Sequence, residues 1–295
     1  MTTETTTAVS NFKGVIFETV QGTAFRTVCE SLKDILVDAI LHFAPEGIQL
    51  ISLDNPKSVI VYMSIVAQNI ERYVCTRRYR LGLNLTTLYK IVKGVTAADT
   101  LTLMYNESDP QKFQIVINNM EKRTKYTYVM HLLNLDESPL DLQLDFNLFS
   151  MVVQMPSQSF QRACKDILTC GGQFVEVKAS KNCLFMKSPG SNVALELSLY
   201  DFNPAISVDD KTPMVTQRQV QSQIQNDETL SFGEFPIRQM YMFSKCSHVT
   251  NMITLYLQTD LPLVMEYQAG NLGVVRYCIA SVQENKKQNA LPPRA

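Results

Sequence analysis

Leu85–Gly94, with the sequence LTTLYKIVKG, recurs in altered form 152 residues later as Ile237–Cys246, with the sequence IRQMYMFSKC. In both stretches the apolar residues follow helical spacing, and an apolar–Thr–apolar alternation comes shortly afterwards. The matched positions are Leu88 with Met240, Tyr89 with Tyr241, and Lys93 with Lys245. Each stretch therefore predicts a short amphipathic helix that leads into a strand.

An earlier segment is also repeated, with a shift of 135 residues between Ala24–Leu36 and Ser159–Leu168. The matched positions are Phe25 with Phe160, Cys29 with Cys164, and Leu32 with Ile167. Two matches in the same order indicate duplication of one helix–sheet–helix–sheet unit. The unequal shifts predict a longer loop in the second copy, and the polar, glutamine-rich segment Asp201–Gly233 is the candidate.

Many further segments alternate apolar and polar residues, as in Val193–Tyr200 and Ile253–Leu257, which is typical of strands with one buried face. Numerous strands with only four short helices predict an α+β fold in which each copy contributes two helices and antiparallel sheets. A length of 295 residues suits two domains. The predicted boundaries are a disordered tail at 1–13, a first domain at 14–133, a linker at 134–149, a second domain at 150–283 and a disordered tail at 284–295.

The predicted linker contains several acidic residues and no basic one. Leu140, Leu142 and Leu144 alternate with polar residues along it. This pattern favours an exposed connection that doubles as a surface for partners, and it is equally compatible with an ordinary edge strand.

Composition excludes several classes of protein. A formal net charge of −1 differs from that of a strongly basic nucleic-acid binder. No apolar run approaches the roughly 18 residues of a membrane span, and neither phosphate-cradling glycine motifs nor a GxSxG motif is present. Seven scattered Cys without a CxxC motif favour reduced thiols in an intracellular protein.

None of the three His lies at zinc-ligand spacing from a Cys or another His, so we expect no metal and no cofactor. An enzymatic alternative is a Cys–His hydrolase that uses Cys164 or Cys246 with His248. Cys164 falls on the apolar side of its predicted helix, where an inert core thiol is the simpler interpretation. We therefore expect no enzymatic activity.

The near-zero net charge conceals an uneven distribution. The four predicted helical windows, 24–36, 85–94, 158–169 and 236–246, together contain eight basic and three acidic residues. The acid-free stretch 72–80 adds four arginines, so these segments carry +9 and the rest of the chain −10. A charged helix face usually has no role beyond contact with water. Four helices that all carry excess positive charge at repeat-related positions favour binding to a polyanion through its phosphates. Few features of the sequence indicate recognition of individual bases, so we expect binding that does not depend on the nucleic-acid sequence.

The segments that carry a family resemblance are Tyr73–Arg78 with Leu81–Lys93, Gly47–Asp54, Val20–Asp34, Met155–Asp166 and Leu261–Tyr267. In order and spacing they resemble the signatures of the proliferating cell nuclear antigen family, the eukaryotic sliding clamps. The similarity runs from about Gly14 to Val282, nearly the whole chain.

The resemblance implies a closed ring of three subunits, in which the helices surround duplex DNA without sequence specificity and the sheets form the outer wall. Such a clamp is a polymerase processivity factor, which tethers replication and repair proteins. It implies as partners duplex DNA, DNA polymerase, other client proteins with short peptide motifs, and a clamp loader. A monomeric processivity factor of the same fold is the alternative.

The resemblance also implies three sets of site residues. The DNA-binding residues are Arg26, Lys33, Arg77, Lys90, Lys93, Arg162, Lys165, Arg238 and Lys245. The pocket for partner peptides is formed by Leu53, Ile60, Leu140, Leu142, Pro262, Ile279 and Ala280. Except for the linker leucines, core packing is the alternative role of most pocket residues. The subunit interface uses Tyr126, Tyr128, Met130, Val193 and Leu195.

The chain departs from the family pattern at Asn55–Ser58, Thr76, Cys278 and Ser281, and its N-terminal tail and Asp201–Gly233 loop are longer than usual. These departures leave the specificity for partner peptides open and suggest a divergent lineage such as that of a large DNA virus. The implied location is the nucleus or, for a viral protein, the site of viral DNA replication.

Overall fold

A computed structural model gives the structure of the chain. It describes residues 12–54, 58–136, 145–180, 183–190, 193–200, 203–205, 231–248 and 250–282. The chain forms two compact units. Unit 1 comprises Met1–Ser52, Val61–Leu140 and Gln268–Val275, and unit 2 comprises Leu53–Ile60, Asp141–Tyr267 and Arg276–Ala295.

Several predicted features lie outside the described residues. They are most of the N-terminal tail, the centre of the linker with Leu140 and Leu142, most of the Asp201–Gly233 loop, and the whole C-terminal tail.

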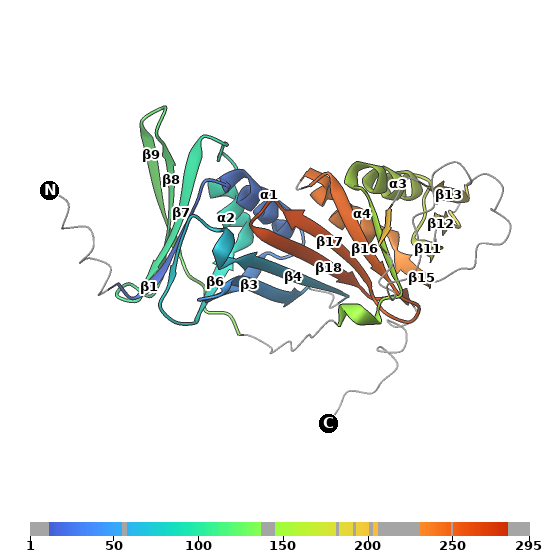
Figure 1. Cartoon of the computed structure of the whole chain (residues 1–295), viewed down its shortest axis with the longest axis horizontal. Helices are drawn as coiled ribbons and strands as arrows, with labels where there is room; N and C mark the ends of the chain where they lie inside the picture. The colour runs from blue at the N-terminus through green and yellow to red at the C-terminus, as the bar shows by residue number, and fades with distance from the viewer. Residues whose placement is uncertain are drawn as a thin grey trace, which may run out of the picture. The chain divides into compact units, whose positions relative to one another are not determined.

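The described part of the first half of the chain contains two helices, one short 3-10 helix and nine strands, which can be followed in Figure 1. In chain order these are β1 (Gly14–Thr19), α1 (Gly22–Lys33), β2 (Asp38–Ala44), β3 (Gly47–Leu53), β4 (Val59–Val66), η1 (Ala67–Asn69), β5 (Arg72–Cys75), β6 (Tyr79–Asn84), α2 (Leu85–Val92), β7 (Asp99–Asn106), β8 (Lys112–Asn119) and β9 (Thr124–His131).

The described part of the second half repeats this order of elements. In chain order these are η2 (Phe146–Leu148), β10 (Met151–Pro156), α3 (Ser157–Thr169), β11 (Phe174–Ala179), β12 (Leu184–Ser188), β13 (Leu195–Leu199), β14 (Asn203–Ala205), β15 (Ser231–Pro236), α4 (Ile237–Ser244), η4 (Lys245–His248), β16 (Met252–Leu257), β17 (Leu263–Ala269) and β18 (Gly273–Ile279).

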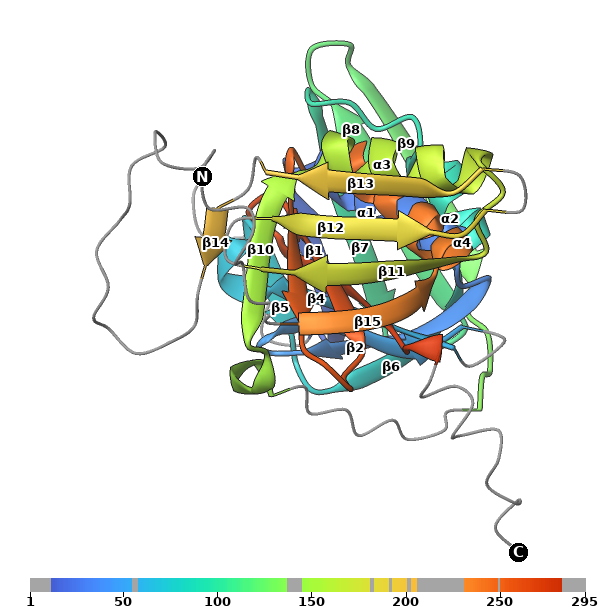
Figure 2. The same cartoon turned by 90° about the vertical axis from the view of Figure 1, so that its right-hand side faces the viewer.

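Sheet topology confirms the duplication predicted from the repeats. The first half contains the strand orders β5-β1-β7-β8-β9 and β4-β3-β2-β6. The second half contains β14-β10-β16-β17-β18 and β13-β12-β11-β15, so each strand of one half has a counterpart nine strand numbers later. Figure 2 shows the second of these sheets, β13-β12-β11-β15, facing the viewer. The α+β fold with antiparallel sheets and few helices is thus as the sequence predicts.

Equivalent pairs of strands place equivalent residues in the two cores. Phe17 of β1 lies opposite Leu103 of β7, and Val153 of β10 lies opposite Leu255 of β16. All four side chains are buried. Because successive side chains of a strand point to opposite faces, this register fixes which face of each sheet the helices cover.

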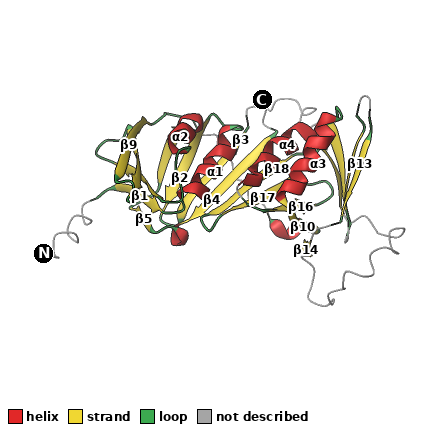
Figure 3. Ribbon diagram, turned by 90° about the horizontal axis from the view of Figure 1, so that it is seen from above, coloured by secondary structure: helices red, strands yellow, loops and turns green. Residues whose placement is uncertain are grey.

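Each pair of helices packs side by side within its own half, α1 with α2 and α3 with α4 (Figure 3). The buried residues of α1 include Phe25, Val28 and Leu32, which recur at helical spacing and form one apolar stripe. In α3 the equivalent stripe includes Phe160 and Ile167. The remaining side of each helix is left to polar and charged residues.

We expect Phe160→Ala to lower the free energy of unfolding by about 3–5 kcal/mol, because it leaves a cavity under α3. The matched control is Gln158→Ala on the exposed side of the same helix, which we expect to change that free energy by less than about 0.5 kcal/mol. Urea denaturation followed by circular dichroism measures both. Equal effects of the two substitutions would contradict the assignment of Phe160 to the core.

Candidate nucleic-acid interface

Two polar contacts fix the α1–α2 pair. Arg26 of α1 donates from Nη1 to the carbonyl of Val95, just beyond α2, at 2.8 Å. Tyr89 of α2 donates its hydroxyl hydrogen to Glu30 Oε1 of α1 at 3.0 Å. The half-buried Arg26 therefore has a structural role as well as a positive charge, and part of its guanidinium is already engaged.

Lys33, at the end of α1, is also partly engaged. Its Nζ lies 2.5 Å from Asp34 Oδ1 and 4.9 Å from the centre of the Tyr89 ring. The adjacent carboxylate offsets its charge, so a bound polyanion would have to compete with Asp34 for this ammonium group.

Lys90 and Lys93 differ from these two residues. Both are exposed, and neither lies within ion-pairing distance of a carboxylate among the described residues. Lys93 is the C-cap of α2. A cation stabilises the negative end of a helix dipole, so Lys93 contributes to the helix while its ammonium group stays free to bind a ligand.

The α3–α4 pair presents a similar exposed set, with Arg162 and Lys165 on α3, Arg238 on α4 and Lys245 at its C-cap. Arg162 lies 3.9 Å from Asp166, the outer limit of an ion pair. Lys245 lies over the ring of Tyr241 at 5.4 Å. The repeat thus places Lys93 and Lys245 at the same cap of equivalent helices.

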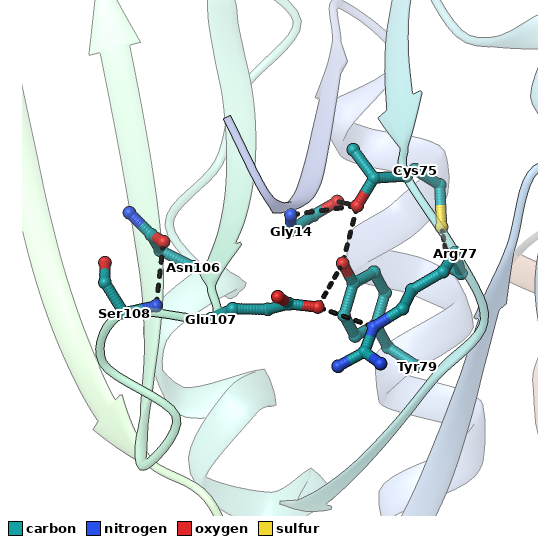
Figure 4. Close-up of polar contacts among 8 residues, drawn as sticks. Gly14, Cys75, Arg77, Tyr79, Asn106, Glu107 and Ser108 are labelled. Atoms are coloured by element: carbon teal, nitrogen blue, oxygen red, sulfur yellow. Dashed lines mark hydrogen bonds and ion pairs between the residues drawn. The ribbon is translucent and has the colours of Figure 1, made fainter. Parts of the chain in front are cut away.

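Arg77 lies elsewhere, in the connection between β5 and β6 rather than on a helix. Its Nε is 2.5 Å from Glu107 Oε1, and its guanidinium lies over the ring of Tyr79 at 5.3 Å. Figure 4 shows Arg77 and Tyr79 converging on Glu107 from one side. Of the nine predicted DNA-binding residues, eight lie on helices or their caps, and Arg77 is the exception.

The Arg77 network joins the β5–β6 connection and the first residue of β6 to the loop after β7 and to the start of β1 (Figure 4). Tyr79 donates its hydroxyl hydrogen to Glu107 at 2.9 Å, and the Thr76 hydroxyl lies 2.5 Å from the Tyr79 hydroxyl. Thr76 in turn accepts from the backbone N–H of Gly14, at the start of β1. The hydrogen bond from Tyr79 and the charge of Arg77 hold the pKa of Glu107 below its usual range. This arrangement indicates that Arg77, through Glu107 and Tyr79, helps to fix the start of β1.

Of the predicted interface residues on β9, Tyr126 and Tyr128 are exposed and Met130 is buried. All three share one face of the strand, and their partners across β8 are Ile117, Ile115 and Phe113. Those partners are buried, so the core of the sheet continues to its edge and leaves two tyrosines uncovered there. Among the described strands β9 pairs with β8 alone, which leaves the other edge of its backbone without a strand partner there.

The other predicted interface segment lies at the edge of the β13-β12-β11-β15 sheet. Among the described strands β13 pairs with β12 alone, Leu195 is half-buried, and Val193 just before the strand is exposed. β9 and β13 are therefore edge strands of the described structure that carry apolar side chains.

The predicted pocket residues differ in exposure. Leu53, Ile60, Pro262 and Ala280 are half-buried, whereas Ile279 is fully buried. Leu140 and Leu142 lie outside the described residues. Ile60 packs against a cluster formed by Phe149, Val264 and Cys278.

Sequence reasoning missed the aromatic part of this cluster. Phe146, Phe149 and Tyr256 make mutual ring contacts at 4.9–6.0 Å between centroids. The Arg276 guanidinium lies over Phe146 at 4.5 Å and pairs with Glu266 at 2.6 Å. The available signal was the pair Phe146 and Phe149, three residues apart at the end of the predicted linker 134–149.

The thiols in the described residues are free, and burial raises the pKa of Cys29, Cys164 and Cys278, the last to about 12. Such thiols are poor nucleophiles. Within the described ranges no group of three or more His, Cys, Asp or Glu residues is placed to hold a metal ion. In the same ranges no helix has the length and apolar character to cross a membrane.

Comparisons with known proteins agree on one family. The model of the proliferating cell nuclear antigen N-terminal domain matches residues 16–139, and that of the C-terminal domain matches residues 144–282. The chain is 25% identical over 264 residues to the "Probable DNA polymerase sliding clamp 1" of Paramecium bursaria Chlorella virus 1, a match that covers 90% of this chain and 95% of that protein.

A solved structure supports the same fold. Proliferating cellular nuclear antigen from Entamoeba histolytica superposes with a TM-score of 0.76 at 19% sequence identity. The superposition covers 90% of this chain and 98% of the other.

Arg77 forms an ion pair with Glu107, whereas Lys90 and Lys93 form none with the described carboxylates. We therefore expect the double variant Lys90→Ala, Lys93→Ala to weaken binding to duplex DNA more than Arg77→Ala does. The slope of log affinity against log salt concentration should fall by about 0.9 for each phosphate that the variant no longer binds. Fluorescence anisotropy with a labelled duplex over a salt series measures both effects. A larger loss from Arg77→Ala would place the main contact in the β5–β6 connection instead.

Proposed function

The chain belongs to the proliferating cell nuclear antigen family and is a DNA polymerase sliding clamp, and we propose that it acts as a closed homotrimer around duplex DNA. In this proposal the two domains are those predicted from the sequence, and α1, α2, α3 and α4 all face the DNA. The sheets form the outside of the ring.

The observation that carries the proposal is the set of exposed basic side chains on both helix pairs. Among the described residues, Lys90, Lys93, Lys165, Arg238 and Lys245 have no carboxylate within ion-pairing distance. Such groups bind phosphates without regard to base sequence, and binding through a few exposed charges is weak enough to permit sliding. The proposed contact set is completed by Arg26, Lys33 and Arg162, with a smaller contribution from Arg77.

The unpaired edges of β9 and β13 support the proposed closure of the ring. β9 of one subunit would pair with β13 of the next, and the residues at this contact would be Tyr126, Tyr128, Met130, Val193 and Leu195. Because the two edges differ, the contact is head-to-tail, and head-to-tail contacts generate rings when the rotation closes. Strand addition of this kind satisfies backbone hydrogen bonds and covers the two exposed tyrosines.

For the clients, we propose that short peptide motifs dock beside the linker, on Leu53, Ile60, Pro262 and Ala280 with Leu140 and Leu142, and that Ile279 supports them from the core. DNA polymerase is the first such client, and a clamp loader opens the ring. The proposed site of action is that of DNA replication.

The family is generally non-enzymatic, and we propose no catalytic activity; the raised pKa of Cys164 argues against a thiol nucleophile.

We expect the purified chain to have a mass of about 100 kDa in light scattering, three times the 33.4 kDa of one subunit. A closed ring assembled on circular DNA should stay bound through a high-salt wash and should be lost when a restriction enzyme linearises the DNA. A stable monomer that leaves circular and linear DNA at the same rate would favour the monomeric processivity factor of the same fold.

We expect Tyr126→Asp to convert the trimer to monomers, since a carboxylate at the β9 edge cannot be buried without a partner. The matched control is Val37→Asp, because the two side chains are 56% and 55% exposed and Val37 lies far along the chain from either edge strand. Sedimentation velocity distinguishes the species. Trimers in both variants would exclude β9 from the subunit contact.

A further inference from the structure

The turn between β8 and β9, together with the first residues of β9, carries three basic side chains that the contact set above does not use. Lys122, Arg123 and Lys125 are all exposed. Glu121 is the one acidic residue between Asn119 and Lys125, so this segment carries a net charge of +2. Among the described residues no carboxylate lies within ion-pairing distance of the three cations.

A chain of buried and partly buried hydrogen bonds attaches this turn to the loop that follows α2. Asp99, at the start of β7, accepts through Oδ2 from the backbone N–H and the hydroxyl of Thr96, at 2.7 and 2.8 Å. Through Oδ1 it accepts from Asn119 Nδ2 at 2.6 Å. Asn119 Oδ1 then accepts from the backbone N–H of Lys122 at 2.8 Å.

The same connection holds α1. Val95, one residue before Thr96, provides the carbonyl that accepts from Arg26 of α1. Asp99 and Asn119 are both buried, at 6% and 5% exposure, so this link is protected from water. The β8–β9 turn therefore lies at the end of its sheet where β1 leads into α1, and Figure 1 shows its tip at the upper end of β8 and β9.

Asp99 remains ionised in this environment. Burial alone would raise its pKa, but the hydrogen bonds from Thr96 and Asn119 and the charge of Lys122 lower it below the usual range. A buried anion thus fixes the backbone of the turn. Its basic side chains project from a firmly held turn rather than from a loose loop.

The backbone of Arg123 gives a second indication. Arg123 has a φ of +52°, in the left-handed region where Gly and Asn are preferred. The conformation of the turn therefore does not favour arginine at this position. An arginine that is exposed, without an ion pair and in an unfavourable conformation is best explained by a ligand for its guanidinium.

We propose that the β8–β9 turn binds the phosphate backbone of duplex DNA through Lys122, Arg123 and Lys125, and extends the basic surface of α1 and α2. This inference rests on the proposed function, because it takes the helices to face the DNA. β9 begins directly after the turn, so in the proposed ring each turn would contact phosphates beside a boundary between subunits.

The test uses the full-length protein and a fluorescent duplex over a series of salt concentrations. The turn variant is Lys122→Gln, Arg123→Gly and Lys125→Gln. The control is Lys112→Gln, Lys178→Gln and Lys187→Gln, which removes the same total charge from three cations that already pair with Asp109, Glu176 and Glu196. Lys112 begins β8, about 23 Å along the strand from Asn119.

We expect the turn variant to bind DNA roughly two- to fivefold more weakly for each phosphate that it no longer binds. The salt slope should fall by about 0.9 per phosphate, while the control keeps the wild-type slope. The single variant Arg123→Gly should lose DNA affinity with little change in its unfolding temperature, because Gly suits the turn. Weaker binding through misfolding would instead lower that temperature.

A turn variant with wild-type affinity and salt slope would overturn the inference. So would a turn variant that bound DNA normally but formed weaker trimers, since the turn would then contact the neighbouring subunit. Failure of the proposed function is a separate result. It would appear in the wild-type protein as escape from circular DNA at the same rate as from linear DNA, whatever the turn variant does.

Discussion

Each helix of this molecule must bury one apolar side against its sheet and its partner helix, and that constraint determines which residues remain for a ligand. The stripe containing Phe25 and Leu32 in α1, and that containing Phe160 and Ile167 in α3, occupy the buried side. The polar sides left over carry more cations than carboxylates. Because the same packing occurs in both copies, the cations at the C-caps of α2 and α4 fall at equivalent places. One packing requirement, used twice, thus produces exposed basic groups on both helix pairs.

The duplication, the α+β fold and the family were predictable because they depend on local periodicity and on the order of segments. The helix of Leu85–Val92 begins at the predicted residue, and the strand predicted over Ile253–Leu257 is β16, Met252–Leu257. Short strands such as β5 and β14 gave no clear alternation, because four or three residues contain too few positions to show one. Their assignment depends on pairing with β1 and β10, which lie far away in sequence.

The details of the candidate site were less predictable for the same physical reason. The charge of Arg77 is evident from the sequence, but its pairing with Glu107 joins residues 30 positions apart and depends on how β6 and β7 are placed. The β8–β9 turn is similar: its three cations are visible in the sequence, and only the buried link from Asp99 to Asn119 shows that they lie at the helix end of the sheet. Sequence patterns show which residues are charged. Tertiary hydrogen bonds decide where those charges are held and which of them remain free.

Weak contacts and a closed ring depend on each other. Exposed ion pairs contribute only up to about 1 kcal/mol each, so an open protein with these cations would dissociate readily from DNA at moderate salt. Stronger contacts would hold the DNA better but would also resist movement along it. The proposed ring avoids this conflict, because escape would then require the edges of β9 and β13 to separate rather than the phosphate contacts to break. The many backbone hydrogen bonds of a strand pair can therefore provide retention, while the basic side chains of the helices need only keep the duplex centred and free to slide.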